Sequence, residues 1–295
     1  MFDCHFHLEE SLVSVPGLIA GMDRAGIKKT NLLPNVCPPL EALSGLARTV
    51  LPLFRRVIHG RPGPLHRLML AMYGNAVKPG DQVDLLGKRY PVKPQPDNDA
   101  PAAAAQAHPD RFTWFAWVNP AGPVDPISEL ERVQDRPGLC GVKAHPYWHH
   151  YPVAKLMDTA ALCQDRGWPL LIHLGPYEQG DFRVLPENFP RLKLIHAHAG
   201  IPYSFELRQY AGTTANVYVD FSNLEYTDLR VHQQCLAILG PEKCLFGSDG
   251  PYFHASGDRF HYQPFLEALD ALRLSDRDRE KVAGKNFEDL IKPGL

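Results

Sequence analysis

The first eight residues of the chain include those best suited to binding a metal. Polar Asp3, His5 and His7 alternate there with apolar residues and Cys4. In a β-strand, alternate side chains point to the same face, so we expect these three polar residues to converge. Neutral imidazoles are good ligands for a divalent cation, and two on one face can reach the same ion. A short His-x-His pattern also fits a strand whose histidines only make hydrogen bonds, so later residues must decide.

Further polar side chains follow later apolar runs, namely Lys143, His145, His173, His196, His198 and Asp249. Each histidine taken alone could be structural. If the runs are strands of one barrel, however, these side chains meet at its mouth, because barrel chemistry lies at the carboxyl ends of the strands. His5 and His7, with His173 and Asp249, would then offer three nitrogens and one oxygen to a metal, with room for water. The recurrence at several strand ends favours an open, catalytic metal site.

Short apolar runs alternate along the chain with amphipathic segments, which is typical of parallel strands joined by helices. The candidate strands are 1–8, 27–33, 112–118, 139–145, 169–175, 192–200, 217–221 and 244–246, and helices are expected at 16–25, 100–107, 125–134 and 153–166. Eight strands favour a (β/α)8 TIM barrel over an open doubly wound sheet. We therefore expect residues 1–295 to form a single barrel domain.

Composition excludes several classes of protein. The 295 residues are 44% hydrophobic, which is enough for a large core. The formal net charge of -2 gives no overall attraction to nucleic acid or to a membrane surface. No apolar run is long enough to span a bilayer, and no secretory signal is evident. The six cysteines form no Cys-x-x-Cys pair, so we expect reduced thiols in a cytoplasmic protein.

The regular alternation lapses between residues 38 and 96, which we interpret as a lid-like insertion after the second strand. The segment has nine basic residues (Arg48, Arg55, Arg56, Arg61, Arg67, Lys78, Lys88, Arg89 and Lys93) and three acidic ones (Glu41, Asp81 and Asp84). A cationic lid would favour a small anionic substrate, for which a carboxylate is the expected charged group. A solvated basic face or a homodimer contact is the alternative.

Apolar residues at helical spacing predict two helices in this insertion, around 46–54 and 68–72. The proline-rich stretch 88–99 is expected to be an extended connector back to the barrel. Arg61, His59 and Tyr73 are the first candidates for substrate contact, with Arg61 as a substrate-binding residue.

Several motifs carry a family resemblance: 3–7 (DCHFH), 141–146 (GVKAHP), 172–173 (IH), 198–200 (HAG), 246–251 (FGSDGP) and the tail 281–287. Together they resemble the amidohydrolase superfamily, in the branch of metal-dependent hydrolases and decarboxylases that includes aminocarboxymuconate semialdehyde decarboxylase and pyrone dicarboxylate lactonase. The resemblance implies that His5, His7, His173 and Asp249 hold one catalytic metal, with His198 as acid or base. The 38–96 insertion matches nothing in that branch.

The nitrogen-rich ligand set makes zinc the first expectation for the metal and manganese the second. In some superfamily members a carboxylated lysine bridges two metals, and Lys143 has the spacing for that role. Since the branch most resembled uses one metal, an uncarboxylated Lys143 is the stronger expectation. His145 shares the face of Lys143, and both are candidates for binding the substrate. His149 and His150 could line the pocket wall.

A divalent ion lowers the pKa of the water that it binds from 15.7 towards about 7. Asp249 could accept that proton, while His198 would act as a general acid or base. His196 competes for this role, but we expect it to be a deeper, hydrogen-bonded residue. The leading hypothesis is a hydrolase of an ester, lactone or amide, and the alternative is a decarboxylase of an unsaturated or aromatic acid. A metal-binding protein without catalysis is less favoured, because every expected ligand position is filled.

Overall fold

The computed structural model describes residues 1–38, 45–78, 82–85, 88–252 and 260–292. Eight neighbouring strands form one sheet, in the order β1 (Phe2–His7), β2 (Lys29–Leu33), β6 (Phe112–Val118), β7 (Leu139–Ala144), β8 (Leu170–Ile172), β9 (Leu194–His196), β10 (Val217–Asp220) and β11 (Cys244–Leu245). All pairings in this sheet are parallel. The predicted (β/α)8 barrel is therefore confirmed, with later strands shorter than expected.

The barrel is closed by backbone contacts between β1 and the segment that follows β11. The amide of Cys4 donates to the Phe246 carbonyl at 3.0 Å, and the amide of His7 donates to the Gly250 carbonyl at 2.7 Å. Between them, the Asp249 amide donates to the His5 carbonyl at 2.7 Å. Closure of the barrel thus places Asp249 beside the histidines of β1, although the two are far apart in sequence.

Strand β1 contains an irregularity that changes which side chains face inward. Its pairing with β2 shifts register between Asp3 and Phe6. Phe2 and Cys4 pack inside the barrel, in a cluster with residues of other strands. Phe6 packs outside the barrel, in the core between the strands and the helices. The predicted convergence of Asp3 with His5 and His7 is wrong, because a bulge reverses the alternation of side chains. The Asp3 carboxylate instead accepts hydrogen bonds from Ser248.

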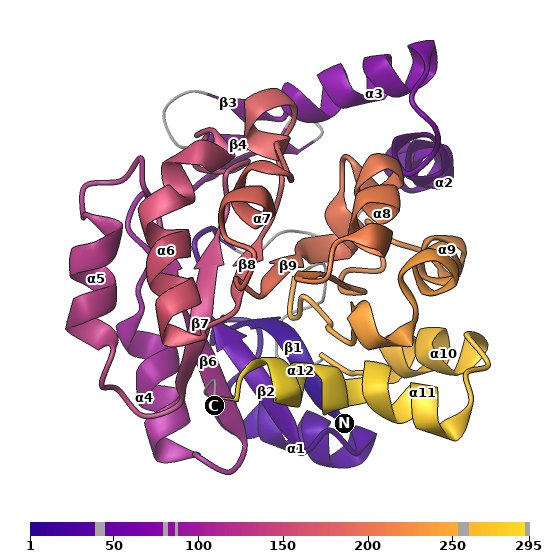
Figure 1. The fold of residues 1–295 in the computed structure, drawn as a ribbon. Helices are drawn as coiled ribbons and strands as arrows, with labels where there is room; N and C mark the ends of the chain where they lie inside the picture. The colour runs from indigo at the N-terminus through magenta and orange to yellow at the C-terminus, as the bar shows by residue number, and fades with distance from the viewer. Residues whose placement is uncertain (39–44, 79–81, 86–87, 253–259, 293–295) are drawn as a thin grey trace.

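Helices cover the outside of the barrel: α1 (Val15–Ala25), α4 (Asp99–Ala107), α5 (Pro126–Val133), α6 (Met157–Arg166), α7 (Val184–Asn188), α8 (Ser204–Thr213), α9 (Leu229–Leu239), α10 (Gln263–Ala271), α11 (Asp276–Glu280) and α12 (Asn286–Leu290). Local signals set their ends. Helix α1, for example, begins where the Ser14 side chain accepts from the Gly17 amide and ends at left-handed Gly26. Helix α12 lies beside the N-terminus (Figure 1), where Phe287 packs edge-on to Phe2 at 4.9 Å.

The insertion contains the two predicted helices, α2 (Gly45–Ile58) and α3 (Pro64–Gly74). It also contains a small antiparallel sheet of β3 (Val77–Lys78), β4 (Gln82–Leu85) and β5 (Lys88–Pro91). Residues 88–91 are extended, as predicted for the connector, and they also pair with β4, which the sequence did not indicate. Figure 1 shows α2 and α3 at the end of the molecule away from both termini. Glu41 and Asp81 lie outside the described residues.

All six cysteines fall within the described residues and are free thiols. Five of them are buried and Cys140 is partly buried. Of the helices described, none is long and apolar enough to cross a membrane.

Candidate metal centre

A cavity opens at the carboxyl ends of the strands. It is lined by His5, His7, Lys143, His145, Trp148, His173, His198, Asn223, Tyr226, Asp249 and Tyr252. The side chains that we predicted from separate strand ends therefore do meet in one place, apart from His196, and Arg61 of the insertion is not part of the lining. Aromatic rings of Trp148, Tyr226 and Tyr252 form much of the remaining wall.

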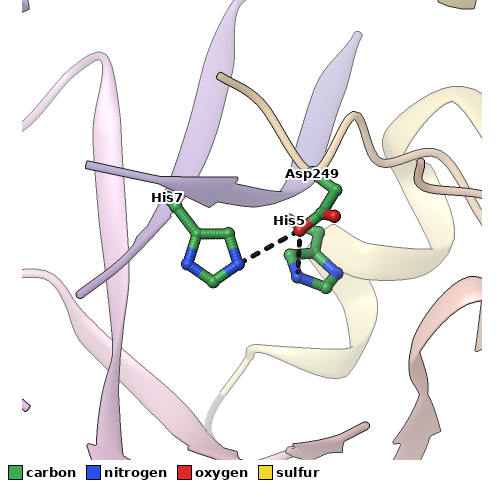
Figure 2. Close-up of side chains that lie close together, drawn as sticks. All are labelled: His5, His7 and Asp249. Carbon is green, nitrogen blue, oxygen red and sulfur yellow. Dashed lines mark ion pairs between the residues drawn. The ribbon is translucent and has the colours of Figure 1, made fainter. Parts of the chain in front are cut away.

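Three of the expected ligands lie in a tight cluster. Figure 2 shows His5 and His7 of β1 pointing at the same carboxylate oxygen of Asp249. The Nε2 atom of each imidazole is 3.1 Å from Asp249 Oδ1. Ligands bound to one zinc ion at about 2.0–2.1 Å in tetrahedral geometry lie about 3.3 Å apart. The observed spacing therefore fits a shared cation.

Both imidazoles are oriented by acceptors at their other nitrogen. His5 Nδ1 lies 2.8 Å from Asp220 Oδ2, and His7 Nδ1 lies 3.1 Å from the Pro34 carbonyl oxygen. Because these partners only accept, Nδ1 of each ring carries the proton and Nε2 keeps its lone pair. The buried Nε2 of His5 has no hydrogen-bond partner. An unsatisfied lone pair aimed at a carboxylate is what a metal site needs, so these residues fit a divalent cation.

The charge states also suit a metal. Burial alone would raise the pKa of Asp249, but His198, His5 and His7 lower it well below its usual value, so the carboxylate is ionised. Burial lowers the pKa of His7, against the opposing effect of Asp249. His7 is therefore neutral, as a metal ligand must be. Asn223 donates from Nδ2 to Asp249 Oδ2 at 2.7 Å, which leaves Oδ1 for the histidines.

His173 follows β8 and lines the cavity. Its Nε2 does not face Asp249, as the Nε2 atoms of His5 and His7 do. That nitrogen is 2.9 Å from the hydroxyl of Tyr73 on α3. The His173 ring stacks on His145 with centroids 4.2 Å apart and meets His198 edge-on at 4.8 Å. The described structure thus brings His173 to the site, but of the four proposed ligands only His5, His7 and Asp249 have donor atoms close to one another among the described residues.

The predicted strand 192–200 included His198, but β9 ends before this residue. The strand ends at His196, and the following turn holds His198 and Ala199 at φ of 52° and 54°. Left-handed backbone is costly for residues other than glycine and is frequent at functional sites. The turn places His198 Nε2 3.9 Å from Asp249 Oδ2 and His198 Nδ1 3.2 Å from the Ser222 carbonyl oxygen. His196 stays deeper as predicted, but neither of its ring nitrogens has the expected hydrogen bond.

Asp220 is a site residue that the sequence analysis missed. Besides His5 Nδ1, it accepts from the His198 amide at 2.8 Å and from Ser222. The carboxylate is fully buried, and although burial alone would raise its pKa, His5, His198 and Ser222 lower it below the usual value. Asp220 ends the apolar run of β10, so the signal that pointed to the other strand ends could have found it.

The remaining candidates divide between the cavity and the surface. Lys143 is buried, with Nζ 5.6 Å from the centre of the Trp117 ring, and burial lowers its pKa to about 8. His145 Nδ1 accepts from the Trp148 amide at 3.0 Å. Arg61 is exposed, and its guanidinium lies over Phe205 rather than in the cavity lining.

Three further histidines have other surroundings. His59 is buried between α8 and the loop after β10, so it joins the insertion to the barrel. His149 is buried with neither ring nitrogen hydrogen-bonded. His150 Nδ1 lies 2.8 Å from Gln179 Nε2. The described structure includes none of these three in the cavity lining.

Solved structures share this fold over almost the whole chain. A probable 2-pyrone-4,6-dicarboxylic acid hydrolase from Acinetobacter baumannii, with citric acid bound, has a TM-score of 0.59 and 14% identity and covers 98% of both chains. A dihydroxybenzoic acid decarboxylase from Polaromonas with bound manganese has a TM-score of 0.58 and 16% identity and covers 98% of this chain and 96% of its own. A 2,6-dihydroxybenzoate decarboxylase from Rhizobium has a TM-score of 0.57 and 16% identity, covering 98% of both chains. At these identities the likeness shows the fold alone.

No curated protein matches the sequence. The family comparison is independent of the fold: residues 87–291 match the Amidohydrolase family. The match covers more than half of the chain and includes β6 to β11 with the residues at their carboxyl ends. The chain therefore belongs to the Amidohydrolase family.

Proposed function

We propose that the protein is a metal-dependent hydrolase that acts on an ester, lactone or amide bond of a small anionic substrate. His5, His7, His173 and Asp249 would hold one divalent ion, with zinc first and manganese second. When bound, such an ion lowers the pKa of water to about 7. The observation that carries the proposal is the convergence of the His5 and His7 Nε2 atoms on one oxygen of the ionised Asp249 carboxylate, each at 3.1 Å.

Other roles in the proposed reaction belong to side chains around the metal site. Asp249 would offer Oδ1 to the metal, while its Oδ2 accepts from Asn223 at 2.7 Å and lies 3.9 Å from His198 Nε2. Burial lowers the pKa of His198 to about 4, so the ring is neutral and can accept a proton as a general base. Lys143 and His145 both line the cavity, and we propose that they bind an anionic group of the substrate. We propose a structural role for Arg61, because it lies outside the lining.

Decarboxylation of an aromatic or unsaturated acid is the second candidate. The observation that favours it is the aromatic wall of Trp148, Tyr226 and Tyr252, which suits a flat ring. A single metal and uncarboxylated Lys143 are proposed in both cases, since Lys143 lies against Trp117 at 5.6 Å.

The surface of the insertion indicates a protein partner. Five of the exposed large apolar side chains, Val50, Leu53, Leu65, Leu68 and Met72, lie on α2 and α3. On α3 they are spaced three and four residues apart and form one stripe. Clustered exposed apolar residues are typical of interaction surfaces, so we propose a homodimer through this face. The free cysteines agree with a cytoplasmic location.

Paired assays test the proposal. Purified protein is analysed for metal, treated with a chelator, and then restored with zinc or manganese. Lactone hydrolysis is measured with 2-pyrone-4,6-dicarboxylate and carbon dioxide release with 2,6-dihydroxybenzoate. We expect turnover to be lost on chelation and recovered with metal, with hydrolysis the faster reaction. Carbon dioxide release alone would select the decarboxylase, and turnover that survives chelation would exclude both candidates.

A further inference from the structure

We propose that Tyr73 of the inserted helix α3 is a positioning residue for His173, and that its hydroxyl and the metal compete for the same nitrogen. This inference rests on the proposed function, because it requires His173 to be a metal ligand. The insertion supplies none of the proposed metal ligands. Through Tyr73 it would nevertheless influence how tightly they bind the metal.

The contact itself is direct. The Tyr73 hydroxyl lies 2.9 Å from His173 Nε2, and both residues are buried. A phenol keeps its proton at neutral pH and can donate it in a hydrogen bond. In the tautomer with the proton on Nδ1, His173 Nε2 accepts from this phenol, and the same tautomer offers Nε2 to a metal. One lone pair cannot serve both partners.

Packing holds the phenol in place. Its ring stacks on Tyr147 with centroids 4.4 Å apart and planes 18° from parallel. The Tyr147 hydroxyl donates to the backbone carbonyl oxygen of Tyr73. Phe54 of α2 stacks nearby, with centroids 6.3 Å from Tyr73. A ring fixed by neighbours and by its own backbone presents its hydroxyl at one position.

The insertion is also fastened to the barrel around the site. His59 at the end of α2 contacts Ser204 Oγ at 2.7 Å and the Tyr226 carbonyl oxygen at 2.8 Å. At the end of α3, a Cβ added to Gly74 would lie 2.9 Å from Pro176, in the segment that follows His173. The backbone beside Tyr73 therefore lies directly against the loop of the residue that it holds.

The competition predicts the direction in which loss of the Tyr73 hydroxyl changes metal affinity. A hydrogen bond that exists without metal and is lost on metal binding weakens the binding, so its removal should strengthen it. The net contribution of an ordinary hydrogen bond corresponds to about a 2- to 12-fold change in affinity. A merely structural role for Tyr73 would act in the opposite direction, because loosening the site lowers affinity.

The test is a titration of full-length, metal-free protein with Co²⁺. Binding is monitored by the visible absorption of the bound Co²⁺. We expect Tyr73→Phe to bind Co²⁺ about 2- to 12-fold more tightly than the wild type, with the same spectrum. Tyr210→Phe on α8, outside the cavity lining, is the control, and its affinity should stay within about twofold. In a His173→Ala background the Tyr73→Phe change should have no effect.

Equal or weaker Co²⁺ binding by Tyr73→Phe would overturn the competition. Should that variant fail to fold by circular dichroism, Tyr73→Met also lacks the hydroxyl and gives the same readout. If the wild type binds no Co²⁺, the proposed metal-dependent function fails together with this inference. If the wild type binds and the Tyr73 variants do not bind more tightly, only the role of Tyr73 fails.

Discussion

Two histidines separated by one residue can share a cation through the ring nitrogens that their other contacts leave free. In β1 this is decided by what each Nδ1 contacts, namely the carboxylate of Asp220 for His5 and a backbone carbonyl for His7. The Asp220 contact is the stronger, because a hydrogen bond to a carboxylate is charge-assisted. It also links His5 to the turn that carries His198, whose amide donates to the same carboxylate. One side chain therefore orients two residues of the site.

Replacing Asp220 with Asn should weaken metal binding. The amide keeps the shape of the side chain but can present its NH₂ group to His5 Nδ1, which disfavours the required tautomer. We expect metal affinity to fall about 10- to 100-fold, as for other residues that orient a histidine ligand. Competition with a chelating dye would measure it, with exposed Asp110→Asn as the control. Unchanged affinity would show that His5 does not depend on this carboxylate.

His198 is expected to serve the reaction rather than to hold the metal. Its Nε2 is 3.9 Å from Asp249 Oδ2, farther than the 3.1 Å contacts of His5 and His7. The variant His198→Ala should keep its metal and lose about 10²- to 10⁴-fold in kcat. Metal content and turnover are measured on the same sample. Loss of metal from that sample would instead make His198 a ligand, together with His5 and Asp220, with which it forms a second group of close donors.

At the scale of elements, the site depends on how closely the segment after β11 approaches β1. The two run side by side through backbone hydrogen bonds, and Ser248 adds side-chain and backbone contacts to Asp3. Gly247 lies at the closest point: a Cβ there would be 3.1 Å from His5 Cβ and 3.2 Å from both Cys4 and Ser222. The absence of a side chain is what lets Asp249 reach the histidines.

The variant Gly247→Ala should therefore disturb both stability and metal binding. Overpacking of a close-packed interior costs about 1–3 kcal/mol, and any shift moves His5 relative to Asp249. Gly21→Ala in α1 is the matched control, since its new Cβ would meet its nearest neighbour at an ordinary 3.8 Å. Denaturant unfolding and metal titration are measured for both. If Gly247→Ala resembled the control in both assays, the close approach would not matter to the site.

At the scale of the whole molecule, α12 packs against one end of the barrel and the insertion lies at the other. Phe287 of α12 fills the end near the N-terminus, next to Phe2. The insertion lies at the opposite end and reaches the cavity through Tyr73. Its helices also expose apolar side chains, such as Leu68 at 55% and Met72 at 58% of full exposure. The same segment can thus contact the site on one side and a partner on the other.

The variant Leu68→Glu should dissociate the proposed homodimer, because a charge in an apolar interface loses its hydration without a partner. Light scattering over a range of concentrations is expected to show a dimer for the wild type and a monomer for this variant. Ile238→Glu, at an exposed apolar position on α9, is the control and should stay dimeric. A wild-type monomer at all concentrations would exclude the dimer.

The sequence alone determined the class of fold and the place of the site. Both depend on local periodicity: apolar runs such as Leu170–Ile172 show where strands end, and polar residues directly after them must lie at the mouth of a barrel. That reasoning selected nearly all of the histidines and the carboxylate that now share one cavity. It also identified Tyr73 in the insertion without showing what it contacts.

Only the tertiary structure decided which of these side chains touch. The bulge in β1 turned Asp3 away from the histidines, and a left-handed turn moved His198 off its strand. Asp220 became the partner of His5, Tyr73 that of His173, and Arg61 faced outward. Each of these outcomes depends on contacts between segments distant in the chain or on a single backbone irregularity. Periodicity carries no information about either, because it describes one segment at a time.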